Sequence, residues 1–178
     1  SQLANLLALE GELGRELLDF VQPHSRPVRA ILFDKSETRN WALGWHQDRT
    51  IAVVSRVEVE EFGPWTVKQG IHHVQPPIAI TSAMRTVRIH LDPVSPDNAP
   101  LLIALGSHRQ GWIDVHTVEE TVAKSCTTEC LAERGDIWVY HTPILHASRA
   151  STGGARRRVL QVDYSASTLP GALEWIGV

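Results

Sequence analysis

Short β-rich runs, each followed by turn residues, constrain the fold of this 178-residue chain more than any other feature. The runs are rich in β-branched and aromatic residues, and they cover residues 28–33, 45–57, 85–91, 101–105, 136–140 and 157–164. Strands at this spacing, accompanied by one firm helix, are typical of an antiparallel sandwich or barrel. No repeat or flexible linker interrupts them. We therefore predict one mainly β domain over residues 1–178, with its β core at about 28–165.

The N-terminal segment has a different pattern from the rest of the chain. Apolar residues recur at helical spacing from Leu3 to Val21, with charged residues between them. This pattern predicts one amphipathic helix, interrupted by Gly11 and ended by Pro23. Because such a helix has one apolar face to bury, we expect the helical lead-in, residues 1–22, to flank the sheet.

Composition excludes several classes of function. The net charge of −3 and the short basic run Arg156–Arg158 give no reason to expect a nucleic-acid partner. No apolar stretch approaches the roughly 20 residues that span a bilayer, and no signal-peptide pattern opens the sequence. Cys126 and Cys130 are too few for a disulfide framework. We predict two reduced thiols, with no role at the site, in a cytoplasmic protein.

A possible metal site begins at Trp45-His46-Gln47-Asp48. Residues two positions apart lie on the same face of a strand, so the imidazole of His46 and the carboxylate of Asp48 can bind one ion. The third ligand has two candidates, His141 and His146, which both follow the run at 136–140. Two histidines and one carboxylate, with the opposite side open, form the facial triad of non-haem Fe(II) oxygenases.

A second histidine–aspartate pair competes with the first. His90-Leu91-Asp92 has the same spacing, but Asp92 precedes Pro93 and opens a turn, where aspartate is commonly bonded to its own backbone. An isolated pair of this kind is more often a surface or capping pair than a metal site. The aromatic residues around His46 favour the first pair as ligands. His90 and Trp45 remain weaker candidates for lining a substrate pocket.

The motifs, taken together and in order, resemble those of the phytanoyl-CoA dioxygenase family, whose members are Fe(II)- and 2-oxoglutarate-dependent oxygenases. The resemblance covers roughly residues 28–165 and implies a double-stranded β-helix, the cupin-like jelly roll. The matching segments are Trp45–Asp48, Arg88–Asp92, Asp97-Asn98 leading to Gly106-Ser107-His108, Leu145–Ser148 and Arg157–Tyr164. One departure is Asn98-Ala99, where the family usually has Asn-Gly. The chain is also shorter than typical members, and no substrate motif carries over.

The resemblance also implies roles for individual residues. His46, Asp48 and His146 match the iron ligands, Arg157 matches the arginine that pairs with the distal carboxylate of 2-oxoglutarate, and Ser148 matches a position that can hydrogen-bond this carboxylate. The implied enzyme uses Fe(II), 2-oxoglutarate and O2 to hydroxylate a small molecule, and releases succinate and CO2. Halogenating relatives lack the carboxylate of Asp48, so hydroxylation is favoured.

Strand patterning gives a different choice of arginine. Arg156 and Arg158 share a face with Leu160, Val162 and Tyr164, and this is the more apolar face, so patterning alone turns them inward. The resemblance selects Arg157, on the face of Gln161 and Asp163. We favour Arg157, because a jelly-roll strand can be buried on both faces, by the opposite sheet and by a covering helix.

Two other functions remain compatible with the residues. The first is a cupin-like metalloprotein, an isomerase or small-molecule binding module, that does not use O2 and does not need Arg157. The second is a non-catalytic module whose metal is structural.

Overall fold

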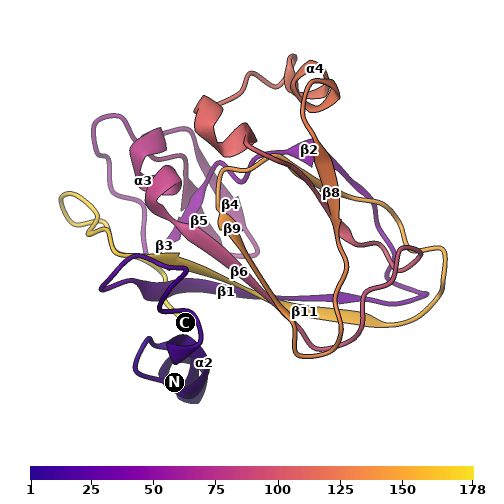
Figure 1. Cartoon of the computed structure of the whole chain (residues 1–178). Coiled ribbons are helices and arrows are strands. Elements are labelled where there is room, and N and C mark those ends of the chain that lie inside the picture. The colour runs from indigo at the N-terminus through magenta and orange to yellow at the C-terminus, as the bar shows by residue number, and fades with distance from the viewer.

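The computed structural model describes residues 1–178 and contains two facing antiparallel sheets (Figure 1). The first sheet has the order β1-β11-β6-β9 and the second the order β2-β10-β7-β8. Their strands are β1 (Arg26–Lys35), β2 (Leu43–His46), β6 (Arg85–His90), β7 (Leu101–Ala104), β8 (Thr127–Cys130), β9 (Ile137–His141), β10 (His146–Ser148) and β11 (Arg157–Ser165). This arrangement is the predicted jelly roll.

A third, smaller sheet has the order β3-β5-β4. It consists of β3 (Ile51–Val53), β4 (Trp65–Lys68) and β5 (Ile71–Val74). Three short helices lie in the connections between strands: α3 (Ile78–Ala83), the 3-10 helix η1 (Ser107–Gln110) and α4 (Val118–Ala123). No helix has both the length and the apolar character needed to cross a membrane.

The N-terminal segment covers the outer face of the first sheet, as predicted, but it does so as two short helices. These are α1 (Gln2–Leu7) and α2 (Glu12–Arg15), and α2 lies on the side of β1 away from β2 and β8 (Figure 1). The break lies at the predicted interruption, Gly11, but the prediction of one helix continuing to Pro23 is wrong in extent, because the chain folds back on itself and α2 ends at Arg15. A side chain at Gly14 would place its Cβ 1.8 Å from the carbonyl oxygen of Ala8, so this close approach requires glycine.

The core beneath these helices accounts for the apolar face of β11. Leu7 and Leu17 pack against Val162 and Tyr164, and the Tyr164 hydroxyl donates a hydrogen bond of 2.7 Å to the carbonyl oxygen of Leu7. Both faces of β11 are therefore buried, one beneath the helices and one between the two sheets.

Candidate metal centre

His46 and His146 are brought together by strand pairing. They are direct partners in the antiparallel pairing of β2 with β10, and their ring centroids lie 4.3 Å apart. Asp48 follows two residues after His46, just beyond the end of β2. One imidazole nitrogen from each histidine and one Asp48 oxygen all lie within 4.8 Å of one another. The three residues are thus close enough to hold a single ion.

Both histidines present the same ring nitrogen to this site. Nδ1 of His46 lies 2.7 Å from the carbonyl oxygen of Gly44, and Nδ1 of His146 lies 2.9 Å from that of Ile144. A carbonyl oxygen can only accept, so Nδ1 carries the proton in each ring and Nε2 is left with a free lone pair. Burial lowers the pKa of His146, which favours the neutral ring that a metal requires. Its Nε2 lies 3.8 Å from Oδ2 of Asp48.

Gln47 fixes the short segment between the two ligands. Its amide nitrogen donates to the carbonyl oxygens of Gly111 (2.9 Å) and Pro143 (2.7 Å), and its amide oxygen accepts from the backbone of Ile113 at 2.9 Å. A buried side chain with these three bonds fixes the backbone around it. This segment, Gln47–Thr50, is not part of a strand. The predicted strand over 45–57 is therefore wrong in extent: β2 ends at His46 and β3 runs only from Ile51 to Val53.

The alternative ligands lie elsewhere. The His141 ring stacks on that of His108 at 4.3 Å and does not belong to the cluster of ligand atoms. His90 is buried with neither ring nitrogen hydrogen-bonded, and Asp92 accepts hydrogen bonds from Arg158. In the second histidine–aspartate pair, His90 is thus buried in the interior and Asp92 is engaged by Arg158. Only the first pair, His46 and Asp48, lies close to a third candidate ligand, His146.

A cavity of about 350 Å³ opens beside the three residues, between the two sheets. Its lining includes Asp48 and the cations Arg29, Lys35, Lys68, Arg88 and Arg157. Arg88 is buried and donates a hydrogen bond of 2.7 Å to Oε1 of Gln161. The cavity is strongly cationic, and a space of this size and charge fits a small anion.

Arg157 lies at one end of this cavity, with Lys35 as its direct partner in the pairing of β1 with β11. Arg157 is 2% exposed, and one of its terminal nitrogens donates to the carbonyl oxygen of Ala99 at 2.7 Å, whereas its Nε has no partner. Burial lowers the pKa of Arg157 to about 10 and that of Lys35 to about 8, so both are mainly charged at neutral pH. No carboxylate of the chain pairs with either cation, so the charge of both is left without an anionic partner.

Ser148 lies beside Lys35, whose ammonium group donates to its hydroxyl oxygen at 3.2 Å. The ammonium group also donates to the carbonyl oxygens of Trp41 (2.6 Å) and Arg149 (3.1 Å). Because Lys35 uses a lone pair of the Ser148 oxygen, the hydroxyl proton is free to be donated to an anion. Nothing in the sequence pattern indicated Lys35, because the covering elements that bury it come from distant segments.

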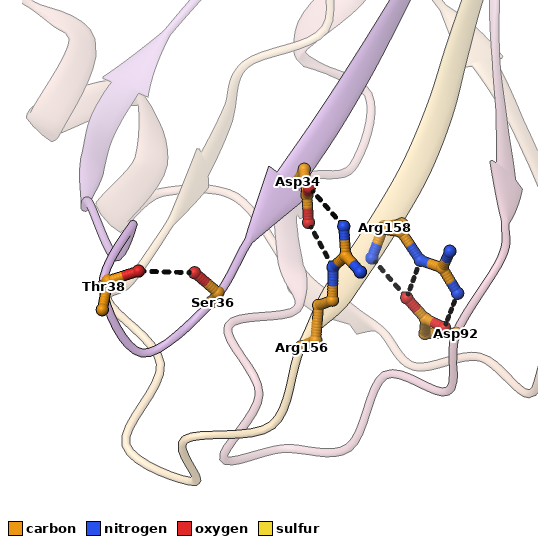
Figure 2. A network of polar contacts seen from close by, with 6 residues as sticks. All are labelled: Asp34, Ser36, Thr38, Asp92, Arg156 and Arg158. Atoms are coloured by element: carbon orange, nitrogen blue, oxygen red, sulfur yellow. Dashed lines mark hydrogen bonds and ion pairs between the residues drawn. The ribbon is translucent and has the colours of Figure 1, made fainter.

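Arg156 and Arg158 face away from the cavity, so the expectation from patterning alone is wrong. Arg156 pairs with Asp34 at 2.8 Å and Arg158 with Asp92 at 2.7 Å (Figure 2). The hydrogen bonds from Arg158 lower the pKa of Asp92 to about 2. The apolar residues beyond Arg158 face the N-terminal helices, so apolarity marked the helix-covered face and not the interior of the sandwich.

Neither weaker pocket candidate lines the cavity. His90 lies on the same strand as Arg88 but deeper, and burial is the main cause that lowers its pKa to about 4. Trp45 packs against Ala104 and Leu145 on the other face of its sheet, because its side chain points opposite to that of His46. Sequence reasoning also assigned no role to Ser107 of the Gly106-Ser107-His108 segment, whose hydroxyl oxygen accepts a hydrogen bond of 2.8 Å from the backbone N–H of Leu145, the residue before His146.

Ala99 has a backbone that suits glycine better. Its φ is 53°, in the left-handed region, and its carbonyl oxygen holds Arg157. This is the position where the sequence departs from the Asn-Gly of the resemblance. We expect Ala99→Gly to raise the free energy of unfolding by about 1 kcal/mol, since a Cβ is disfavoured there by roughly 1–2 kcal/mol and glycine loses more chain entropy. Denaturant titration measures this, and an unchanged or lower stability would contradict it.

The two thiols lie apart from the site. Cys126 is exposed, whereas Cys130 is 1% exposed in a cluster with Leu101 and Ile103, and no disulfide joins them. We expect the double variant Cys126→Ser, Cys130→Ala to bind the same amount of metal as the wild type, although the smaller alanine lowers stability. Metal content after dialysis checks this, and a loss of metal from the folded variant would show that a thiol contributes to the site.

Comparisons with known proteins agree with this geometry. The family model of phytanoyl-CoA dioxygenase matches residues 13–159. The chain belongs to the phytanoyl-CoA dioxygenase family. This family consists of oxygenases that use Fe(II), 2-oxoglutarate and O2. No curated protein is detectably similar to the chain in sequence.

Solved structures share the fold of this family member. HygX from Streptomyces hygroscopicus, solved with nickel and 2-oxoglutarate bound, is 15% identical with a TM-score of 0.59 over 95% of this chain and 67% of its own. EctD from S. alaskensis is 14% identical with a TM-score of 0.62 over 92% of this chain and 52% of its own. AviO1 from Streptomyces viridochromogenes Tue57 is 22% identical with a TM-score of 0.56 over 83% of this chain and 54% of its own. The chain spans about half the length of EctD and AviO1.

Proposed function

We propose that this chain is an Fe(II)- and 2-oxoglutarate-dependent dioxygenase that hydroxylates a small molecule. The observation that carries the proposal is the coincidence of two features in one cavity: a cluster of two histidines and one carboxylate, and a buried arginine without an anionic partner. Membership of the phytanoyl-CoA dioxygenase family supports the same activity, as does HygX, a structural neighbour that binds nickel and 2-oxoglutarate.

The residues present fit the metal and the co-substrate. His46 and His146 would bind the ion through their free Nε2 atoms and Asp48 through its carboxylate, a donor set suited to non-haem Fe(II). Arg157 would bind the distal carboxylate of 2-oxoglutarate, with its unpartnered Nε as one donor. The hydroxyl of Ser148, oriented by Lys35, would donate to the same carboxylate.

When bound, the iron supplies the redox chemistry: with O2 it couples decarboxylation of 2-oxoglutarate, to succinate and CO2, to oxidation of a substrate C–H bond. The chain's own residues contribute position and environment. Gln47 holds the His46–Asp48 segment rigid, and the buried cations hold the co-substrate in one orientation. The carboxylate of Asp48 fills the position that halogenating relatives leave to chloride, which favours hydroxylation.

The alternative, a cupin-like metalloprotein that does not use O2, would have the same histidine ligands but would not require an arginine that binds a carboxylate. The burial of Arg157 without an anionic partner favours the oxygenase, because a buried cation costs free energy that a bound anion would offset. Incubation with Fe(II), ascorbate and 2-oxoglutarate tests the choice. We expect succinate to form with the wild type and not with His146→Ala. Absence of succinate from a wild type that binds iron would favour the alternative.

A further inference from the structure

The cations of the cavity are distributed between two ends. Arg29, Ile31, Phe33 and Lys35 alternate along β1 and all line the cavity. Lys35 pairs with Arg157 across the sheet, whereas Arg29 pairs with Asp163. The six residue-to-residue steps from Arg29 to Lys35 span roughly 20 Å of strand. The cavity therefore has a second cationic end, far from the one assigned to the co-substrate.

The metal ligands lie between these ends. Ser148 lies two residues beyond His146 on β10 and contacts Lys35, so the Arg157 end is on the His146 side. Arg29 and Asp48 together line a second, very small void, so Arg29 is on the Asp48 side. A 2-oxoglutarate molecule that is held at Arg157 and reaches the metal ligands would leave the Arg29 end free for the molecule to be oxidised.

Lys68 adds a second cation at this end. It ends β4, and with Gln69 in the turn before β5 it lines the cavity. Neither Arg29 nor Lys68 forms an ion pair with a carboxylate of the chain. Asp163, the register partner of Arg29, accepts a hydrogen bond from Thr86 at 2.9 Å and forms no ion pair with Arg29. The half-buried Arg29 and the exposed Lys68 thus line the free part of the cavity without an ion-pair partner.

The charges of the bound groups would not neutralise the cavity. Five cationic side chains and one carboxylate line it, a formal charge of +4 with Lys35 protonated. Fe(II) would add two positive charges and 2-oxoglutarate two negative ones, so the excess would remain. In a partly enclosed space, such an excess attracts anions and disfavours cations.

We propose that the molecule oxidised by this chain is a small anion, whose carboxylate or phosphate group is bound by Arg29 and Lys68. This rests on the proposed function, since the Arg157 end is assigned to 2-oxoglutarate. The volume of about 350 Å³ lies near the lower end of the roughly 300–1,000 Å³ of ligand pockets. Because co-substrate and substrate share this space, the anionic group and the reacting carbon belong to a short molecule.

Calorimetric titration of the protein loaded with Ni(II) and 2-oxoglutarate tests the proposal without turnover. The probes are short-chain carboxylates and phosphate monoesters, each beside an amide or alcohol of the same carbon skeleton. We expect at least one anion to bind 10-fold or more tightly than its neutral counterpart, and the better class of anion identifies the group. If no anion is preferred over its neutral counterpart, the proposal is wrong.

Variants locate the binding. Arg29→Gln and, separately, Lys68→Gln should weaken the preferred anion by roughly 10- to 100-fold, as expected for a lost charge-assisted hydrogen bond. Lys124→Gln removes an exposed lysine outside the cavity and should leave the affinity for the anion unchanged. Unchanged anion affinity in both cavity variants would overturn the proposal, and a matching loss of 2-oxoglutarate affinity would assign these cations to the co-substrate. If the wild type binds neither Ni(II) nor 2-oxoglutarate, the proposed function itself fails, which is a separate result.

Discussion

Arg157→Ala is expected to weaken the binding of 2-oxoglutarate by between about 30-fold and several thousand-fold, with metal still bound. Arg157 is 2% exposed and no carboxylate of the chain pairs with it. On the proposed binding mode, removing it would leave the distal carboxylate of 2-oxoglutarate without its charged partner. Such a loss costs on the order of 2–5 kcal/mol. Calorimetric titration of 2-oxoglutarate into the Ni(II)-loaded variant, without O2, measures it.

Arg158→Ala is the matched control, because Arg157 and Arg158 are neighbours on β11 whose side chains point to opposite faces of the strand. Arg158 pairs with Asp92 at the surface (Figure 2), so its loss should lower stability slightly and leave 2-oxoglutarate affinity unchanged. Arg157→Lys adds a second comparison: it keeps the charge but loses the planar donor pair, so an intermediate affinity is expected. If affinity falls in Arg158→Ala and survives in Arg157→Ala, the assignment of the co-substrate end is wrong.

His46→Ala and His146→Ala are each expected to lower metal affinity by more than about 100-fold. Each variant removes one of three protein ligands, and even the outer partners of metal ligands are commonly worth 10–100-fold in affinity. Titration of Fe(II) into the metal-free protein without O2 measures the change. Circular dichroism shows whether each variant keeps its strands, which separates loss of ligand from loss of fold.

His90→Ala is the control for this experiment, because His90 belongs to the competing histidine–aspartate pair. It is 3% exposed and lies outside the cluster of ligand atoms, so its removal should cost stability through a cavity and leave metal affinity near the wild-type value. Loss of metal in folded His90→Ala, with retention in His46→Ala, would move the site to the second pair.

The sequence was sufficient for those parts of the fold that local patterns specify. The runs at 28–33, 85–91, 136–140 and 157–164 correspond to β1, β6, β9 and β11, the four strands of the first sheet. β10 was missed because it has three residues, His146–Ser148, too few to form a pattern. Its place in the sheet depends on pairing with β2 and β7, which no local signal reports.

The candidate site depended on long-range information in the same way. Spacing placed His46 and Asp48 on one face, but patterning turned Arg156 and Arg158 inward, which is wrong, because both faces of β11 are buried and by different partners. The resemblance of the ordered motifs selected Arg157. Lys35 and Arg29 were not predicted, since a lysine or arginine in a strand usually faces solvent, whereas both line the cavity between the two sheets.

The most direct test of the central claim is the visible absorption of the protein after Fe(II) and 2-oxoglutarate are added without O2. A keto acid that chelates Fe(II) gives a charge-transfer band, which neither component gives alone. We predict a band that saturates at one Fe(II) per chain in the wild type and in His90→Ala, and that is absent from His146→Ala. No band in the wild type, or an undiminished band in His146→Ala, would contradict the assignment of His46, Asp48 and His146 as the iron site.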